Sequence, residues 1–211
     1  MELQMLAPSE YVRIQDDPTR YYRVPLLGWI YRRRVARCIS MLPAGGRVLE
    51  IGYGSGVSFL NLSQKFSEIH GIDLHAHSDE VAHSFTHTQS NLHLRQGDVR
   101  ALPYEDGTFD AAIAVSIHEH LPPDTQDEAF AEVRRVLAPG GCYVVGVPGV
   151  NAMMTTAFSA LGWDIRPYHI SKETRVLEAM GHALTMDVTR YWPRLWFQSQ
   201  TAYVCARAWK R

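Results

Sequence analysis

The segment from Phe109 to Ile117 constrains the fold more than any other part of this chain. It reads Phe-Asp-Ala-Ala-Ile-Ala-Val-Ser-Ile, so a strand formed here would present apolar residues on both faces. Such a strand must be covered on both sides, as happens in parallel sheets flanked by helices. We therefore expect this segment at the centre of a parallel sheet, with Asp110 in a structural capping or pairing role at its start.

Strand and helix patterns alternate on either side of this segment. Short apolar runs and apolar residues at helical spacing predict strands at 47–51, 69–74, 92–96 and 142–147 and helices at 26–42, 56–66, 81–87, 124–137 and 171–181. Asp124 and Ser171 are the expected N-caps of the last two helices. The alternation predicts an α/β fold with a doubly wound, mostly parallel sheet and helices on both faces. Runs at 182–191 and 199–209 predict an antiparallel strand pair at one edge.

Length and composition fit one domain. The chain has 211 residues, 46% of them apolar and 20% charged, which excludes fibrous and disordered classes. Its parts are an N-terminal helical extension, a core, an insertion with a helix, and the C-terminal strand pair, at 1–46, 47–148, 149–181 and 182–211. No apolar stretch approaches the ~20 residues of a membrane span, and the first residues lack a signal-peptide pattern. We therefore expect no membrane partner and a cytoplasmic location.

Cysteine and charge content argue against a disulfide-rich, a zinc-binding or a nucleic-acid-binding protein. The three cysteines, Cys38, Cys142 and Cys205, lack the spacing of a disulfide framework or zinc cluster and are expected to be buried thiols. A net charge of −1 gives no general attraction to nucleic acid, so no nucleic-acid partner is expected. A local basic face is expected to be the solvated side of a helix, with a phosphate-binding patch as the alternative. It comprises Arg32, Arg33, Arg34 and Arg37.

Glycines follow the first strand of the core, in Glu50-Ile51-Gly52-Tyr53-Gly54-Ser55-Gly56. They permit a tight turn and close approach of a ligand, and the helix that follows would present free N–H groups. The spacing does not fit a dinucleotide fingerprint, which would need a third glycine at Val57, or a P-loop, which would need a lysine. Glu50 beside the turn would repel a pyrophosphate and attract a cation. We therefore expect a cationic ligand.

Two more acids stand where strands are expected to end. Asp73 ends the second strand, where a carboxylate can accept hydrogen bonds from both hydroxyls of a ribose. Asp98 follows the third strand and can accept from an exocyclic amine such as that of adenine. Ligands of open α/β sheets bind outside the carboxyl ends of the strands, so these acids should converge on one crevice. Together they predict an adenosine that carries a positive charge.

The order of these motifs resembles the class I S-adenosylmethionine-dependent methyltransferases, most closely their small-molecule (methyltransferase type 11-like) branch, which includes quinone-pathway enzymes. The resemblance covers about residues 47–148 and rests on Val48 to Gly56, Gly71-Ile72-Asp73, Gly97-Asp98-Val99, Leu102-Pro103, Phe109-Asp110, Glu119-His120-Leu121 and Arg134 to Gly141. It implies a Rossmann-like, seven-stranded sheet whose last strand is antiparallel. It also implies S-adenosyl-L-methionine as the cofactor.

The resemblance further implies which residues hold that cofactor. The glycine turn would hold the methionine part, Asp73 the ribose, and Asp98 with the Val99 backbone the adenine. The full expected set is Glu50, Gly52, Tyr53, Gly54, Gly56, Asp73, Leu74, Asp98, Val99 and Ser116. Tyr53 departs from the family pattern, in which small residues are common, so its ring either shields the cofactor or packs in the core.

Methyl transfer from a sulfonium is an in-line displacement that depends mainly on alignment of donor and acceptor. A base helps where the acceptor is a hydroxyl or a protonated amine. The candidates are His118 and His120, just past the central strand, with orientation of the loop as the alternative role of His120. We expect no metal at His118-Glu119-His120, which has only one carboxylate. The histidine-dense stretch from His70 to His93 lacks a firm acid partner and is expected to be exposed and metal-free.

The acceptor is expected to be a small, apolar or aromatic molecule that is methylated on an O, N or C atom. DNA amino-methyltransferases carry a proline-rich motif where this chain has Ser116-Ile117-His118-Glu119. Apolar residues beyond the core either line an acceptor pocket or build a lid or subunit contact, so a homodimer stays open. They are Met153, Met154, Phe158, Leu161, Trp163, Trp192, Trp196 and Phe197, with Tyr168 and His169 as neighbours that reach the cofactor or pack in a loop.

Two other functions remain open from the sequence. Tyr168 and Lys172 have the Tyr-x-x-x-Lys spacing of NAD(P)-dependent short-chain oxidoreductases. The glycine pattern differs from that of those enzymes, however, and Ser171 between the two residues is expected to cap a helix. A non-catalytic protein that binds S-adenosylmethionine on the same fold is the second alternative.

Overall fold

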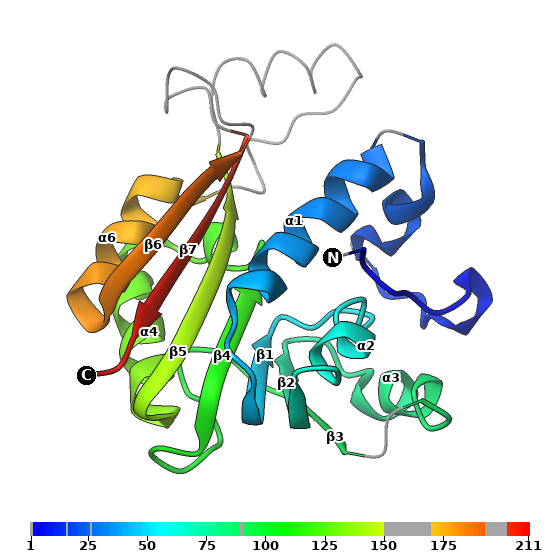
Figure 1. The fold of residues 1–211 in the computed structure, drawn as a ribbon, viewed down its shortest axis with the longest axis horizontal. Helices are drawn as coiled ribbons and strands as arrows, with labels where there is room; N and C mark the ends of the chain where they lie inside the picture. The colour runs from blue at the N-terminus through cyan, green and yellow to red at the C-terminus, as the bar shows by residue number, and fades with distance from the viewer. Residues whose placement is uncertain (1, 16, 26, 89–90, 150–169, 193–201) are drawn as a thin grey trace.

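A computed structural model describes residues 2–15, 17–25, 27–88, 91–149, 170–192 and 202–211. These residues form a seven-stranded sheet with the order β3-β2-β1-β4-β5-β7-β6 (Figure 1). The strands are β1 (Gly45–Ile51), β2 (Phe66–Asp73), β3 (Leu92–Gln96), β4 (Phe109–Val115), β5 (Leu137–Pro148), β6 (Thr185–Trp192) and β7 (Tyr203–Trp209). β7 runs antiparallel to both of its neighbours, and the other pairs in this sheet are parallel. The predicted sheet and its antiparallel last strand are confirmed.

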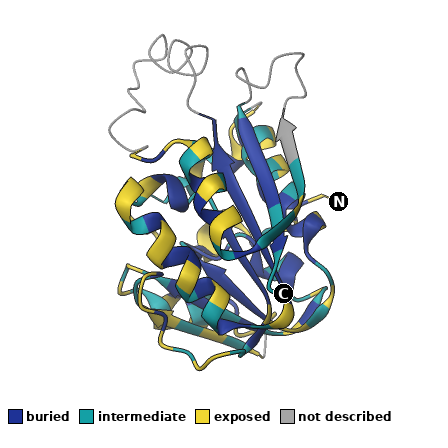
Figure 2. Ribbon diagram, turned by 90° about the vertical axis from the view of Figure 1, so that its left-hand side faces the viewer, coloured by how far each residue is buried: buried dark blue, intermediate teal, exposed yellow. Residues whose placement is uncertain are grey.

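Helices cover both faces of this sheet, as predicted. They are α1 (Leu27–Met41), α2 (Phe59–Leu62), α3 (Ser78–Ser84), α4 (Gln126–Val136) and α6 (Glu173–Ala183), with short 3-10 turns η1 (Pro8–Glu10), η2 (Pro18–Arg23), η3 (His118–His120) and η4 (Pro123–Thr125). One core cluster joins α1, α2 and α3 to the first face, and a second joins α4 and α6 to the other. Figure 2 shows the buried strands between helices whose outer sides are exposed. Within the described ranges, no helix has the length and hydropathy needed to cross a membrane.

The central position of β4 follows from its small apolar residues. Ala111, Ala112, Ile113 and Ala114 are all fully buried. Ala111 and Ile113 belong to the first core cluster, whereas Ala112 and Ala114 belong to the second. Both faces of β4 are therefore covered, as the unbroken apolar run predicts.

The residues before β1 contribute to the first core. Leu3, Leu6, Tyr11 and Tyr22 are buried in the same cluster as Val48 of β1. The segment predicted as an N-terminal extension therefore packs against the sheet together with α1. It also reaches the turn that follows β1, as described below.

The helix after the glycine turn is much shorter than predicted. The expected helix spans 56–66, but α2 contains only the four residues Phe59–Leu62. Polar side chains at its start are engaged elsewhere, because Ser58 donates to Glu50 and Asn61 exchanges hydrogen bonds with the backbone of Gln4. The prediction of a regular helix that presents free N–H groups after the glycine turn is therefore wrong.

The two predicted N-caps are also wrong. Asp124 lies inside η4, and Thr125 occupies the N-cap position of α4. Lys172 occupies the N-cap position of α6, while the Ser171 hydroxyl donates to the carbonyl of Leu121 at 2.7 Å. Ser171 thus ties the start of α6 to the loop after β4 and does not cap its own helix.

Asp110 has the structural role expected from its position. Its Oδ2 accepts hydrogen bonds from the backbone N–H groups of Gly46 and Arg47, at 2.9 and 2.8 Å. These bonds hold the start of β1 beside the start of β4. Since each joins a donor to a charged acceptor, their loss should be measurable.

We predict that Asp110→Ala lowers the free energy of unfolding by about 1 to 3 kcal/mol, measured by urea denaturation, because two charge-assisted hydrogen bonds are lost. Asp106→Ala is the matched control, since Asp106 is 78% exposed and forms a surface ion pair with Arg135. Its effect should stay below about 1 kcal/mol. Equal losses in the two variants would contradict the assigned role of Asp110.

Candidate functional site

The turn between β1 and α2 requires glycine at three positions. Gly52, Gly54 and Gly56 have φ angles of 71°, 52° and 81°, in the left-handed region that other residues rarely adopt. A Cβ atom on Gly52 would lie 2.0 Å from Cδ1 of Ile117, and one on Gly56 would lie 2.5 Å from the ring of Phe59. Both backbone conformation and space therefore exclude side chains here.

Three carboxylates converge on this turn. Asp73 at the end of β2 accepts a hydrogen bond from Gly54 N at 2.8 Å, and Asp17 accepts one from Ser55 N at 2.7 Å. Glu50 lies in β1 just before the turn and is buried. The N–H groups at the centre of the turn are thus already bound to carboxylates. A pyrophosphate would face negative charge at this position, whereas a cation would be attracted.

Sequence reasoning missed Asp17. Its carboxylate also accepts a hydrogen bond from Thr19 N at 2.7 Å and thereby caps η2. A Cβ atom on Gly54 would lie 2.4 Å from Asp17 Oδ2, so the N-terminal segment covers the turn closely. The pair Asp17-Pro18 signals the start of a helical turn, but nothing in the sequence connects it to glycines so far along the chain.

The environment of Glu50 favours its neutral form until a cation arrives. Burial raises the pKa of Glu50 to about 8, in spite of a hydrogen bond from the Ser58 hydroxyl, and the charge of Asp73 raises this pKa further. A positive charge beside the turn would favour the ionised carboxylate and so be stabilised by it.

The predicted adenine end of the site lies after β2 and β3. Leu74 follows Asp73 and is 68% exposed, so it offers an apolar surface next to the carboxylate. Val99 is buried. The Asp98 carboxylate accepts two hydrogen bonds from the Arg100 guanidinium, with its Oδ1 3.0 Å from Nε and its Oδ2 2.6 Å from Nη2. A base that bound to Asp98 would therefore have to share this carboxylate with Arg100.

Tyr53 packs in the core. It is 2% exposed, its hydroxyl donates to Ser78 Oγ at 3.0 Å, and its ring lies edge to face against His75 with centroids 5.0 Å apart. A Cβ atom on Gly71 would lie 2.7 Å from this ring, so β2 approaches Tyr53 closely. Of the two roles expected for Tyr53, the structure supports packing.

His118 is engaged on both sides of its ring. Nδ1 lies 3.0 Å from Gln126 Oε1, Nε2 lies 2.7 Å from the Tyr143 hydroxyl, and the ring stacks on Phe130. The side chain is fully buried, and this burial lowers its pKa to about 4. Neither nitrogen is left to take a proton from a substrate. This geometry corrects the expectation that His118 acts as a base and leaves it a role in fixing the loop after β4.

Sequence reasoning also missed Glu119, between the two histidines. It is 1% exposed, and no hydrogen bond from another described residue reaches its carboxylate oxygens. Burial raises its pKa to about 8. His120 is half-exposed, with Nε2 4.0 Å from Glu119 Oε1. Both lie in η3, which follows β4 closely. Between β4 and η3, Ser116 adopts a φ angle of 60° and its hydroxyl lies 3.1 Å from that of Tyr203. Left-handed backbone at a non-glycine residue is often found at functional sites.

The basic face of α1 is only partly solvated. Arg33 is exposed, in agreement with the expectation. Arg34 instead lies over the ring of Tyr31, with its guanidinium carbon 3.9 Å from the centroid and 5.8 Å from that of Tyr203. Its positive charge lowers the pKa of Glu119, although burial has the larger effect. Arg34 therefore forms a polar cluster at the end of β4 together with Ser116, Glu119 and Tyr203.

The remaining predicted substrate residues, Met153, Met154, Phe158, Leu161, Trp163, Tyr168, His169, Trp196 and Phe197, lie outside the described residues, as does the side chain of Trp192.

Comparison with known proteins agrees with this geometry. Residues 48–141 match the family described as "Methyltransferase domain". This part of the chain is therefore similar to a methyltransferase domain. The match begins in β1, contains the glycine turn and ends in β5, so it includes the carboxylates on β1 and β2.

Curated relatives extend the comparison. The fatty-acid O-methyltransferase of Mycolicibacterium smegmatis is 36% identical over 102 residues, which cover 47% of this chain and 36% of that protein. The chain spans between 32% and 46% of the length of the first curated relatives it matches.

Solved structures show that the fold extends beyond the matched residues. A geranyl diphosphate methyltransferase in complex with SAM has a TM-score of 0.71 at 16% identity, covering 100% of this chain and 98% of that one. The cyclase SpnF has a TM-score of 0.68 at 19% identity, covering 95% of this chain and 86% of that one. At these identities the likeness concerns the methyltransferase fold alone.

We predict that stability falls as the pH rises from about 6.5 to about 8.5. Glu50 and Glu119 have an ordinary pKa of 4.5 and a folded-state pKa of about 8, so over this range the folded chain holds protons that the unfolded chain has lost. Stability is then lost as the pH rises through the folded pKa. His118 and His70, whose pKa values are lowered from 6.5, oppose this fall only near the lower end of the range, where the unfolded histidines still carry protons.

Urea denaturation at about pH 6.5 and about pH 8.5 measures this decrease in the free energy of unfolding. Glu50→Gln and Glu119→Gln should each reduce it, and the double variant should nearly remove it. A wild-type stability that is constant or increases over this range would show that these carboxyls are not neutral in the folded protein.

Proposed function

We propose that this chain is an S-adenosylmethionine-dependent methyltransferase that acts on a small, apolar or aromatic molecule. The observation that carries the proposal is the convergence of Asp17, Glu50 and Asp73 on a left-handed glycine turn. Acids in this arrangement suit a cationic nucleoside and oppose a phosphorylated one. The match of residues 48–141 to a methyltransferase domain supports the same ligand.

The residues present fit such a cofactor. The glycines let the acids and the loop after β4 lie close to the turn, and Glu50 provides a carboxylate for the positive charge of the sulfonium and amino groups. Asp73 is partly exposed and has lone pairs left beside its bond to Gly54, so it can accept two ribose hydroxyls. We place the adenine against Leu74, with Asp98 and the Val99 backbone at its polar edge.

We place the methyl acceptor at the end of β4, opposite the turn. When bound, the cofactor supplies an electrophilic methyl group for in-line displacement. His120 is positioned to take the proton of the acceptor, because it is accessible and stands beside the buried Glu119. Glu119 and the Ser116–Tyr203 hydroxyl pair would orient His120 and the acceptor. Orientation of this kind can contribute up to about 7 to 11 kcal/mol.

Two observations bear on the acceptor. A relative is named for fatty acids, which supports a mostly apolar molecule with one polar reacting group. The partly buried guanidinium of Arg34, near Glu119 and Tyr203, adds a positive charge for a polar end. We therefore favour an acceptor with an apolar body and a hydroxyl, carboxyl or amine at the reacting end, methylated on O or N, with C-methylation as the alternative.

Two other functions would require a different ligand or no methyl transfer at the same site. An NAD(P)-dependent oxidoreductase would place a pyrophosphate at the turn, where the N–H groups of Gly54 and Ser55 already bind carboxylates. A protein that binds the cofactor without transferring the methyl group is the stronger rival, since a protein named as a cyclase has this fold. Turnover with an acceptor separates this rival from the proposal.

We expect S-adenosylhomocysteine to bind in isothermal titration calorimetry and NADH not to bind. Asp73→Ala should weaken S-adenosylhomocysteine by about 1.5 to 3 kcal/mol, or roughly 10- to 150-fold, because charge-assisted bonds to the ribose are lost. Asp79→Ala in the first turn of α3 is the matched acidic control and should leave affinity unchanged. Binding of NADH, or an unchanged affinity in Asp73→Ala, would refute the cofactor assignment.

We expect His120→Ala to lower turnover by about 10²-fold or more while the affinity for S-adenosylhomocysteine stays within a few-fold, because a base acts on the acceptor and not on the cofactor. Methyl transfer to a panel of fatty acids, phenols, quinols and amines measures turnover. His182→Ala, an exposed histidine on α6, is the control. A parallel loss of affinity and turnover would indicate that His120 only orients its loop.

A further inference from the structure

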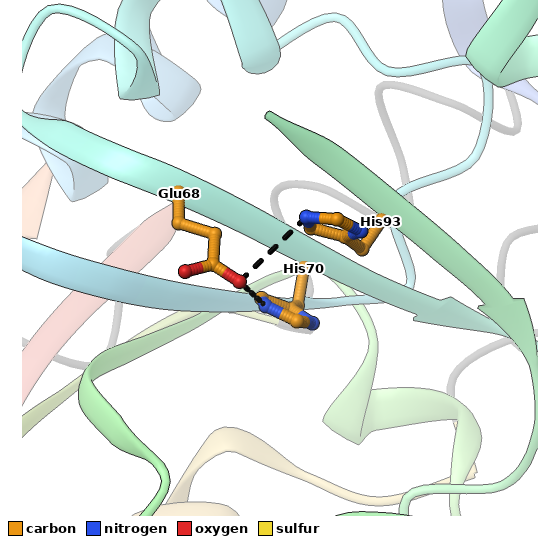
Figure 3. Close-up of side chains that lie close together, drawn as sticks. All are labelled: Glu68, His70 and His93. Carbon is orange, nitrogen blue, oxygen red and sulfur yellow. Dashed lines mark hydrogen bonds and ion pairs between the residues drawn. The ribbon is translucent and has the colours of Figure 1, made fainter. Parts of the chain in front are cut away.

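A second group of polar side chains lies on β2 and β3, away from the glycine turn. Strand register places His70 of β2 directly beside His93 of β3. Glu68 lies two residues before His70 and therefore on the same face of the sheet. The three side chains point toward one another (Figure 3). Glu68 Oε1 lies 2.7 Å from His70 Nε2 and 3.6 Å from His93 Nε2, and one ligand atom from each residue fits within 4.8 Å of the others.

We propose that Glu68, His70 and His93 form a binding site for a divalent transition-metal ion, with Zn²⁺ as the preferred physiological ion. Two imidazole nitrogens and one carboxylate oxygen are a ligand set that Zn²⁺ accepts, with the fourth position open to water. Mg²⁺ and Ca²⁺ prefer oxygen ligands and should not compete. Of the described residues, no other three such side chains meet this distance condition.

The distances between the ligand atoms suit a metal ion, and one imidazole ring must reorient to bind it. With metal–ligand bonds of about 2.0 to 2.2 Å, ligand atoms in a tetrahedral site lie about 3.4 Å apart. The observed distances of 2.7 and 3.6 Å lie on either side of this value. The rings of His70 and His93 stack with an interplanar angle of 28°, so the His93 ring must turn for both rings to face one ion. His70 is held in place edge to face by the rings of Tyr104 and Phe109. His93 is 53% exposed and gives an ion access from solvent.

The surrounding charges leave the ligand atoms available. Arg47 of β1 binds Oε2 of Glu68 at 2.9 Å, so Oε1 is the oxygen that faces the histidines. Hydrogen bonds from His70 and Arg47 lower the pKa of Glu68, and burial lowers that of His70. Both directions favour the forms that bind a metal, an ionised carboxylate and a neutral imidazole.

Two other features limit the affinity. The positive charge of Arg47 opposes that of an ion. His70 Nδ1 is buried and has no hydrogen-bond partner within the described part of the chain, whereas a metal-bound histidine usually donates this N–H to an acceptor. We therefore expect an exchangeable ion bound in the micromolar range, in contrast to a tightly held structural zinc.

This site is separate from the candidate functional site. His70 precedes Asp73 by three residues of extended chain, which is about 10 Å along β2. The sequence prediction of a metal-free histidine stretch depended on the lack of an acid partner. Glu68 provides that partner, because it precedes His70 by one strand period and because β3 brings His93 to the same place. The proposal does not rest on methyltransferase activity.

Untagged protein titrated with Zn²⁺ against a chromophoric chelator tests the site. We expect one saturable equivalent, not displaced by excess Mg²⁺, and at least tenfold weaker binding in His93→Ala and in Glu68→Gln. His182→Ala is the matched control, because His182 is also exposed and paired with one carboxylate, that of Asp127, and its binding should equal wild type. Circular dichroism without metal checks that each variant folds.

Co²⁺ gives an independent signature. A four-coordinate site of nitrogen and oxygen ligands should give visible absorption bands that disappear in His93→Ala and remain in His182→Ala. Absence of a saturable Zn²⁺ equivalent, or equal binding by wild type, His93→Ala and Glu68→Gln, would overturn the proposal. Since His93 is exposed and its ring contacts the partly exposed pair of His70 and Glu68, its replacement should not prevent folding.

Discussion

The close approach of the turn after β1 to the loop after β4 is the constraint on which the site depends. Any side chain at Gly52 would overlap Ile117, which lies one residue beyond the left-handed Ser116. The two loops can meet only because the turn is bare backbone, and their contact brings the acids of β1 and β2 opposite the polar cluster at the end of β4. In the proposed reaction, contact between these two loops would place the methyl donor on one side and the acceptor on the other.

Most of the fold could be predicted because it follows from patterns that are local in sequence. The unbroken apolar run of β4 predicted its central place, and the alternation around it predicted the parallel sheet. The wrong predictions concern polar side chains that can form a hydrogen bond with more than one partner. Ser58 turns to Glu50 instead of starting a long helix, and Ser171 bonds to Leu121 across the chain. Tertiary contacts decide such cases, and spacing alone does not reveal them.

The location of the site could be predicted from the sequence, but the role of each of its residues could not. Positions in sequence cannot tell which residue of His118, Glu119 and His120 faces the core, because all three lie in one short turn. The structure buries His118 among aromatic rings, buries Glu119 without a hydrogen bond from another described residue, and leaves His120 accessible. Asp17 and Glu68 were not predicted for a related reason. Asp17 meets Ser55, and Glu68 meets His93, only because the chain folds or the strands pair over long sequence separations.

The contact of Asp17 with the turn has a practical meaning for anyone who labels this protein. A fluorophore or fusion attached near the first residues sits on a segment that packs beside the site, so it can report occupancy but can also disturb it. The opposite end of the chain behaves differently. β7 runs antiparallel to β5 and ends beside the start of that strand, whereas the glycines follow the end of β1 (Figure 1). Attachment there should leave the site undisturbed.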